Sequence, residues 1–345
     1  MKKKNIIILM LFLLIITAAL IIIGFVFNKT ENEKQNGLSN QYDVSPQHTI
    51  AYVSYQEGKP QLFLQNENET TGIMAAEFDE NTMILDPSFS KDGAILAFIT
   101  TNKDKETKLT STVHLLDLHT NEITEVFTDS STIAEVAFHP QGSSLYYLRA
   151  GTFENYSPIA GKRPHDFDVY EFHLQDQTLK RLTNLSQYSI HSLYVSSTGE
   201  RVFLQRDDDS SVETPEESFQ VKERIFQIPL DRPEKMSVIS DPKREVSVFS
   251  FTMTPSEKEM IYQSISNPDE GGTYKYELYK YNVETKKEIQ LTHIGEYVGD
   301  PVVSADGKTV YFMLDKKFAK GAPEYHLYKM TIDGDNIEEI NLFSS

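Results

Sequence analysis

The 345-residue sequence contains no cysteine and no tryptophan, and it has 33 basic residues against 51 acidic ones, a formal net charge of −18. Without cysteine the chain can form neither disulfides nor thiolate metal sites. The acidic excess argues against nucleic acid or anionic lipid as a partner of the general surface. The sequence also lacks the G-x-S-x-G motif of α/β-hydrolase peptidases. Peptidases of that type are therefore excluded.

Charge is also missing from one long segment at the N-terminus. Lys2, Lys3 and Lys4 precede a run from Ile6 to Phe27 that contains no charged residue. As a helix this run would be roughly 33 Å long, enough for the ~30 Å hydrocarbon core of a bilayer. Flanking lysines predict that the N-terminal end stays in the cytoplasm. The sequence thus predicts a basic flank at 1–5 and a transmembrane signal anchor at 6–27.

Cleavage after Ala19 is the alternative interpretation of this segment. The apolar stretch LIIIGFVF follows Ala19, whereas the chain after a cleavage site should turn polar. We therefore favour an uncleaved anchor, followed by a polar tether at 28–41. The protein is expected to be a single-pass membrane protein with an extracytoplasmic domain. A disulfide-free exported domain is typical of Gram-positive bacteria.

A repeat fills the rest of the chain. Each copy has an apolar residue, then a residue that is mostly Ser or Thr, a turn, and an aromatic residue four or five positions after the turn. The turn positions 48, 93, 142, 199, 257 and 307 are 45 to 58 residues apart. The copies are DVSPQHTIAY (43–52), SFSKDGAILAF (88–98), AFHPQGSSLYY (137–147), YVSSTGERVF (194–203), TMTPSEKEMIY (252–262) and VVSADGKTVYF (302–312).

A second hairpin follows each of these copies, as in HLLDLHTNEITEVF (114–127), where apolar and polar residues alternate on both sides of a turn. Four strands in each of six units predict an all-β fold, a six-bladed β-propeller of four-stranded antiparallel blades. Packing the blades in a ring buries the faces that one blade alone would expose. The expected domain is 42–345, with blades near 42–78, 84–128, 133–184, 189–240, 247–293 and 298–343.

The turn of the last copy, Asp306-Gly307, can be interpreted as a metal-binding loop or as a hairpin turn. Its repetition favours the turn, because Asp can bond to nearby turn amides and Gly can take a positive φ. His48 and Glu257 stand where the other copies mostly have glycine. These two turns are expected to differ in detail.

The units with SKDG (90–93) and SADG (304–307) resemble the Ser-Pro-Asp-Gly blades of TolB-like propellers, which also form the propeller parts of prolyl-oligopeptidase and dipeptidyl-peptidase relatives. The resemblance covers about 300 residues, but the SPQH and TPSE copies depart from its pattern. It implies the propeller fold. It leaves function open, because such blades serve as protein-binding scaffolds and as enzyme gates.

The connections between the second and third strands of the blades are unequal in length and should share one face, which favours that face as the binding surface. The longest, AGTFENYSPIAGKRPHDFD, mixes aromatic and basic residues within an acidic protein. We predict that 150–168 contacts a ligand or partner. Its candidate binding residues are Phe153, Asn155, Tyr156, Arg163, His165 and Asp168.

No catalytic residue, metal ligand or cofactor is assigned. The acidic run 206–217 lacks the fixed ligand spacing of a calcium loop, and the nine histidines form no His-x-His or i,i+4 pair. The expected function is a membrane-tethered scaffold that binds an envelope protein, a peptide or a cell-wall component. The alternatives are a lactonase-like or glycan-active hydrolase with a site in the central channel, and a sensory or accessory ectodomain of an envelope complex.

Overall fold

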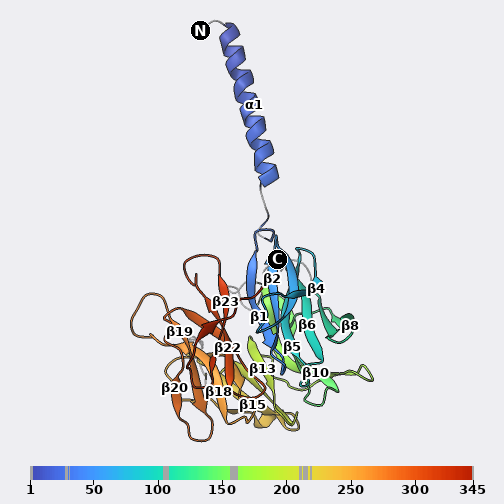
Figure 1. The fold of residues 1–345 in the computed structure, drawn as a ribbon, viewed down its shortest axis with the longest axis vertical. Helices are drawn as coiled ribbons and strands as arrows, with labels where there is room; N and C mark the ends of the chain where they lie inside the picture. Colours follow the sequence, from blue (N-terminus) through green and yellow to red (C-terminus); the bar gives the residue numbers. More distant parts are fainter. Residues whose placement is uncertain are drawn as a thin grey trace.

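In the computed structural model of the protein, the elements of the described residues are β-strands, together with the helix α1 (Lys3–Phe27) and the short 3-10 turn η1 (Pro233–Lys235). Figure 1 shows α1 projecting away from the sheets. The structure describes residues 3–27, 30, 32–103, 109–155, 162–209, 212, 217 and 220–343.

Helix α1 covers the apolar segment of the predicted anchor. Among the residues that the structure describes, however, no helix combines the length and hydropathy needed to cross a bilayer. The membrane anchor therefore stays a prediction from the sequence.

The strands are arranged as antiparallel meanders of four. Sixteen of them form four separate four-stranded sheets, and β17–β24 form one eight-stranded sheet in which a single parallel bridge, Tyr276 to Tyr297, joins two meanders. In chain order, the strands are β1 (Gly37–Val44), β2 (Thr49–Gln56), β3 (Lys59–Asn66), β4 (Ile73–Glu77); β5 (Thr82–Phe89), β6 (Ile95–Asn102), β7 (Ser111–Asp117), β8 (Glu122–Asp129); β9 (Ile133–Phe138), β10 (Ser144–Asn155), β11 (Lys162–His173), β12 (Leu179–Arg181); β13 (Ile190–Val195), β14 (Arg201–Asp207), β15 (Glu223–Pro229), β16 (Ser237–Val238); β17 (Val248–Met253), β18 (Glu259–Ile265), β19 (Tyr276–Asn282), β20 (Glu288–Gln290); β21 (Tyr297–Val303), β22 (Thr309–Asp315), β23 (Tyr325–Thr331) and β24 (Glu338–Glu339).

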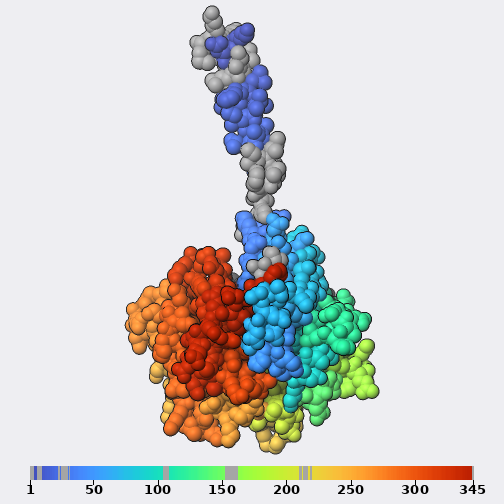
Figure 2. All heavy atoms as spheres, viewed as in Figure 1, coloured from blue at the N-terminus to red at the C-terminus, as the bar shows by residue number. Residues whose placement is uncertain are grey.

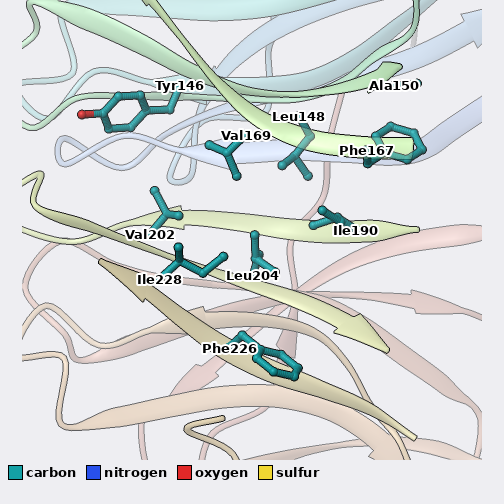
Figure 3. Close-up of a cluster of buried hydrophobic side chains, with 10 residues drawn as sticks. All are labelled: Tyr146, Leu148, Ala150, Phe167, Val169, Ile190, Val202, Leu204, Phe226 and Ile228. Carbon is teal, nitrogen blue, oxygen red and sulfur yellow. The ribbon is translucent and has the colours of Figure 1, made fainter. Parts of the chain in front are cut away.

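The first strands of the meanders form a ring. β1, β5, β9, β13, β17 and β21, here called the inner strands, contact one another in chain order, and β21 returns to β1. A cluster of buried apolar side chains lies between each pair of neighbouring meanders. Figure 3 shows one of them, where Leu148 and Val169 face Ile190, Val202 and Leu204. Each such Leu, Ile or Val contributes on the order of 1.5–3 kcal/mol by leaving water, so the apolar columns of the repeat form the core.

The ring closes between the last meander and the first, which lie against each other in Figure 2. Within the described residues no backbone ladder joins them. Side chains of the first meander instead hold the C-terminal segment. The Tyr52 hydroxyl donates to the Phe343 carbonyl (2.7 Å), and the Gln65 amide accepts from Phe343 N (2.7 Å) and donates to the Asn341 carbonyl (3.0 Å).

All six turns between first and second strands have the same left-handed residue at the repeat's turn position, with φ between 56° and 75°. The turns at His48 and Glu257 thus match the others at this residue. The turn at His48 does differ in length, because Ser45 N bonds to the Thr49 carbonyl one residue earlier than Ser90 N bonds to the Ile95 carbonyl. A non-glycine residue here is disfavoured, and each of the two side chains makes a compensating contact with a neighbouring meander. His48 Nδ1 lies 3.0 Å from the Tyr311 hydroxyl, and Glu257 accepts from Ser197 N at 2.6 Å.

Two predicted boundaries also differ. β1 begins at Gly37 and pairs with β2 there, so the end of the predicted tether 28–41 is strand. The predicted loop 150–168 is paired strand on both sides of residues 156–161, which lie outside the described part of the chain. β10 and β11 stay in register as far as Asn155 and Lys162. The pair Gly151 and Asp166 is missing from the ladder, and Asp166 has a positive φ of 58°, but the register is the same on both sides.

Candidate functional site

The ring has two distinct faces. The turns after the inner strands contact one another, as when Gln47 donates to the Asp92 carbonyl (3.0 Å), and they define the turn face. Because the meanders are antiparallel, the connections between their second and third strands, such as β2–β3 and β10–β11, lie on the opposite side. We call that side the loop face.

A channel cavity of about 850 Å³ runs along the inner strands. Residues from all six strands line it. At the turn face the lining comes from the turns and includes Pro46, Lys91 and Pro255. At the loop face it comes from the beginnings of the strands and includes Phe249 and Tyr297. The two mouths therefore differ in chemistry.

A ring of polar side chains lies midway along the channel. The pairing of every inner strand with its neighbour is irregular at this level. Such bulges turn the backbone and change where side chains point. The polar residues are Gln41, Asp86, Glu135, Ser192, Ser250 and Asp300, all of which line the cavity.

These polar side chains connect neighbouring inner strands. Gln41 accepts from Asp86 N (2.8 Å), Asp86 accepts from Val136 N (2.6 Å), and Glu135 accepts from Ser192 N (2.8 Å). A bond to a carboxylate, such as that of Glu135, is stronger than one to a neutral acceptor such as Gln41. Side chains rather than a shared ladder thus fix the relative positions of the meanders around the channel.

The same pattern continues between β17 and β21, where Asp300 N donates to Ser250 Oγ (3.1 Å). At the closing seam, the Tyr42 hydroxyl donates to the Asp300 carbonyl (2.6 Å), and Asn40 donates to the Asp300 carboxylate (3.2 Å). Asp43, close to the turn face, accepts from Phe89 N (2.7 Å).

Burial in the channel wall works against the charge of these carboxylates. It raises the pKa of Asp43 and of Asp300 to about 6. For Asp86, burial and then the charge of Glu135 raise the pKa well above its ordinary value. Among the residues that line the cavity, Lys91 is the single Lys or Arg. With pKa values of about 6, Asp43 and Asp300 stay mostly ionised near neutral pH, and the channel therefore carries a negative potential with little compensation from protein cations.

An aromatic cluster forms one side of the loop-face mouth. Tyr297 lies 4.8 Å from Tyr276 and 4.7 Å from Phe318, and Phe249 lies 5.7 Å from Tyr276, between ring centroids. These rings come from β17, β19, β21 and the β22–β23 connection. All four are partly exposed. They offer flat apolar surface and electron-rich faces beside the acidic ring.

His191 lies at the same mouth, between a hydroxyl and a carboxylate. Its Nε2 is 2.6 Å from Ser189 Oγ, and its Nδ1 is 3.9 Å from Glu135 Oε1. This order is that of a nucleophile, a base and an orienting acid. The second distance is beyond hydrogen bonding, and both Glu135 oxygens already accept backbone amides. No group of three or more metal-ligating side chains occurs among the described residues.

The predicted binding residues fall on the β10–β11 hairpin. Phe153 and Asn155 are paired backbone positions of β10, opposite Pro164 and Lys162, and Tyr156 lies outside the described residues.

The other three predicted residues are on β11. The Arg163 guanidinium stacks 5.1 Å from the Tyr188 ring, and His165 is buried with Nδ1 3.2 Å from Asp166. Asp168 is 1% exposed and accepts from Thr183, Leu185 N and Arg181. The bonds of Asp168 hold its own meander together. A binding role for the hairpin stays a prediction.

The channel residues were not identified from the sequence, although the repeat contains their signal. Each member of the polar ring stands seven positions before the left-handed turn residue of its copy, as Asp300 does before Gly307. In that alignment the whole column is polar. A polar position that recurs at the same place in otherwise apolar strands is the sequence signal that would have predicted the channel.

The comparisons with known proteins agree with this architecture. TolB from Acinetobacter baumannii is 15% identical, with a TM-score of 0.56 over 91% of this chain and 65% of that one. A putative TolB from Agrobacterium tumefaciens is 13% identical, with a TM-score of 0.56 over 79% and 84%. The β-propeller domain of the Trilobed protease from Pyrococcus furiosus is 14% identical, with a TM-score of 0.52 over 89% and 83%.

The fold is a TolB-like β-propeller. At these identities the likeness concerns the fold alone, and this chain spans less than two thirds of the A. baumannii protein. No protein-family model and no curated protein match the sequence. The activity of the propeller must therefore be argued from its own channel and faces.

Proposed function

We propose that this propeller is a membrane-tethered, extracytoplasmic binding scaffold that holds a positively charged group of a protein or peptide at the loop-face mouth of its channel. The observation that carries the proposal is the open cavity of about 850 Å³, with carboxylates around its middle and aromatic rings at its mouth. A pre-formed concave site of this kind loses little entropy on binding.

The charge of the lining supports a cationic ligand. An ammonium or guanidinium group could approach Asp300 and Glu135 while lying against the Tyr297 ring, which combines ion pairing with a cation–π contact. The amide hydrogen bonds that the carboxylates accept would keep them in place. Binding of this kind weakens with added salt.

The test uses the full chain in detergent and a fluorescent pentalysine peptide, with pentaglutamate as the negative probe. Asp86→Asn, Glu135→Gln and Asp300→Asn together keep a carbonyl acceptor at each position. They should weaken pentalysine binding at least about tenfold, since each nearby charge contributes on the order of 1 kcal/mol.

The matched control removes the same charge from the outer surface through Asp231→Asn, Glu284→Gln and Glu338→Gln, whose side chains are 63 to 68% exposed. Binding should change less than about threefold, because exposed charges are screened by water and salt. Equal losses in the two triple variants would mean that general acidity binds the peptide, and the channel proposal would be abandoned. Circular dichroism of both variants checks that the fold is kept.

We also infer that the propeller has six blades, with β17–β20 and β21–β24 as separate blades. The support is that one apolar cluster lies between each successive pair of meanders, including these two, and that only one backbone bridge joins them. The tether and the extracytoplasmic location are supported by the uncharged run Ile6–Phe27 and the lysines before it.

A hydrolase is the second candidate, favoured by the 2.6 Å contact between Ser189 Oγ and His191 Nε2. A fluorophosphonate probe tests it, since it reacts with an activated serine. Labelling should occur in the unmodified chain and disappear in Ser189→Ala and His191→Ala, while Ser197→Ala at the turn face serves as control. An absence of labelling in the unmodified chain would eliminate a serine hydrolase at this mouth.

A further inference from the structure

The segment that leads from α1 into the ring is docked on the loop face. Gly58 N, in the β2–β3 turn, donates to the Gln35 carbonyl (2.9 Å), and Glu57 N donates to Asn36 Oδ1 (2.8 Å). The fit is close, because a Cβ on Gly58 would lie 2.3 Å from the Asn32 carbonyl oxygen.

A lysine from the next meander contacts this docking site and stabilises it. Lys103 Nζ donates to the Gly58 carbonyl (2.6 Å) and lies 4.7 Å from the centroid of the Tyr55 ring. The β2–β3 turn is therefore held between the incoming segment and the second meander. The N-terminal segment has a defined attachment on the same face as the aromatic cluster.

The free length between α1 and this attachment is short. α1 ends at Phe27, and Asn32 already approaches Gly58. Five Cα steps of at most about 3.6 Å allow roughly 18 Å between these two residues. The headgroup layer on each side of a bilayer is several Å thick. A helix anchored in a membrane would thus keep the loop face close to the headgroups.

We propose that the loop face and its channel mouth look toward the membrane from which the chain is suspended, and that the cationic partner is itself membrane-bound and presents its charged segment close to the bilayer surface. This inference rests on the tether and the binding mouth of the proposed function. The acidic mouth disfavours anionic lipid headgroups as the ligand, which leaves a protein or peptide fixed in the same membrane. The turn face would point away from the membrane.

The absence of cysteine makes this orientation measurable. Single cysteines are introduced by Tyr274→Cys and Lys320→Cys on the loop face, and by Lys258→Cys and Lys308→Cys on the turn face, all four at exposed side chains. Each full-length variant is labelled with a fluorescent donor and reconstituted in vesicles whose headgroups carry an acceptor.

Strands of seven or eight residues at about 3.3 Å each separate the two faces by roughly 25 Å, so transfer from the loop-face positions should be at least about twofold greater. Equal transfer, or greater transfer from the turn face, overturns the orientation. Flotation of the vesicles distinguishes a failure of the tether from a failure of the orientation. A chain that does not float has no anchor and refutes the tether, whereas a chain that floats with its turn face toward the lipid refutes the orientation alone.

The partner is tested in the same vesicles with pentalysine attached to a lipid. A photoreactive group on the Tyr274→Cys variant should cross-link this peptide at least several-fold more than the same group on Lys308→Cys. If the Tyr274→Cys variant cross-linked to plain anionic lipid as much as to the lipid-attached pentalysine, the assignment of a cationic partner would be overturned. Equal cross-linking yields from the two faces would overturn the proposal that the channel mouth on the loop face is turned toward the membrane.

Discussion

Replacing Asp300 by Asn should stabilise the protein near neutral pH. Burial raises the pKa of Asp300 to about 6 from 3.8, the ordinary value for Asp. A shift of about two pKa units corresponds to roughly 3 kcal/mol. Asp300 lines the channel and is partly exposed to it, so we reduce this to about 1–2 kcal/mol. Asn removes the charge, keeps an acceptor for Asn40 and tolerates the positive φ of this position (51°).

The sign of the pH dependence follows from the raised pKa. Between about pH 4 and 6 the folded state binds more protons at Asp300 than the unfolded state does. The penalty for the carboxylate is therefore fully present above pH 6 and disappears as the pH falls toward 4. The gain in unfolding free energy from Asp300→Asn should be largest at pH 7.5 and vanish near pH 4. Urea denaturation at both pH values measures it.

Asp306 provides a control of opposite sign. Hydrogen bonds from Ser304 and from Lys308 N lower the pKa of this exposed carboxyl to about 2. Asp306→Asn should therefore destabilise the protein at pH 7.5. If Asp300→Asn were instead destabilising at pH 7.5, the carboxylate would be a net stabiliser of the seam, and the reasoning about channel charge would fail.

Three further substitutions probe the scaffold. Gly199→Ala should lower the unfolding free energy by about 1–3 kcal/mol, because Gly199 has a φ of 75° and an added Cβ would lie 2.2 Å from the His139 ring. Gly142→Ala is the control, since Gly142 has a similar φ of 71° but open space around the added Cβ. It should lower the unfolding free energy less in the same urea experiment. Gln65→Ala removes two bonds to the C-terminal segment, and we expect faster hydrogen exchange of the last meander and a loss of about 1–3 kcal/mol. Asp168→Asn should lower the thermal midpoint with a loss of about 2–4 kcal/mol, because the charged bond to Arg181 is weakened and a buried network is disturbed.

Much of the scaffold was predictable because its signals are local. The turn column and the alternating apolar residues, such as Leu148 and Val202, are visible within a few residues of one another. The channel was missed because Asp86 and Glu135 occupy strand positions that resemble solvent-facing ones in a single unit. Their burial exists only when all the meanders are assembled. The bonds of Gln65 to residues near the C-terminus were equally inaccessible to sequence reasoning, since they join positions 276 and 278 residues apart.

The way the ring closes has a consequence for how the chain is made. During synthesis the first meander emerges long before the last, and domains fold as their residues become available. The apolar side of the first meander, with Tyr52 and Phe63, is covered by residues of the last meander and by the segment ending at Phe343. That side stays open to water, or to a chaperone, until the last meander and the segment ending at Phe343 have left the ribosome. The channel therefore comes into existence in one late step, and premature termination would yield a chain with an exposed apolar face and no binding mouth.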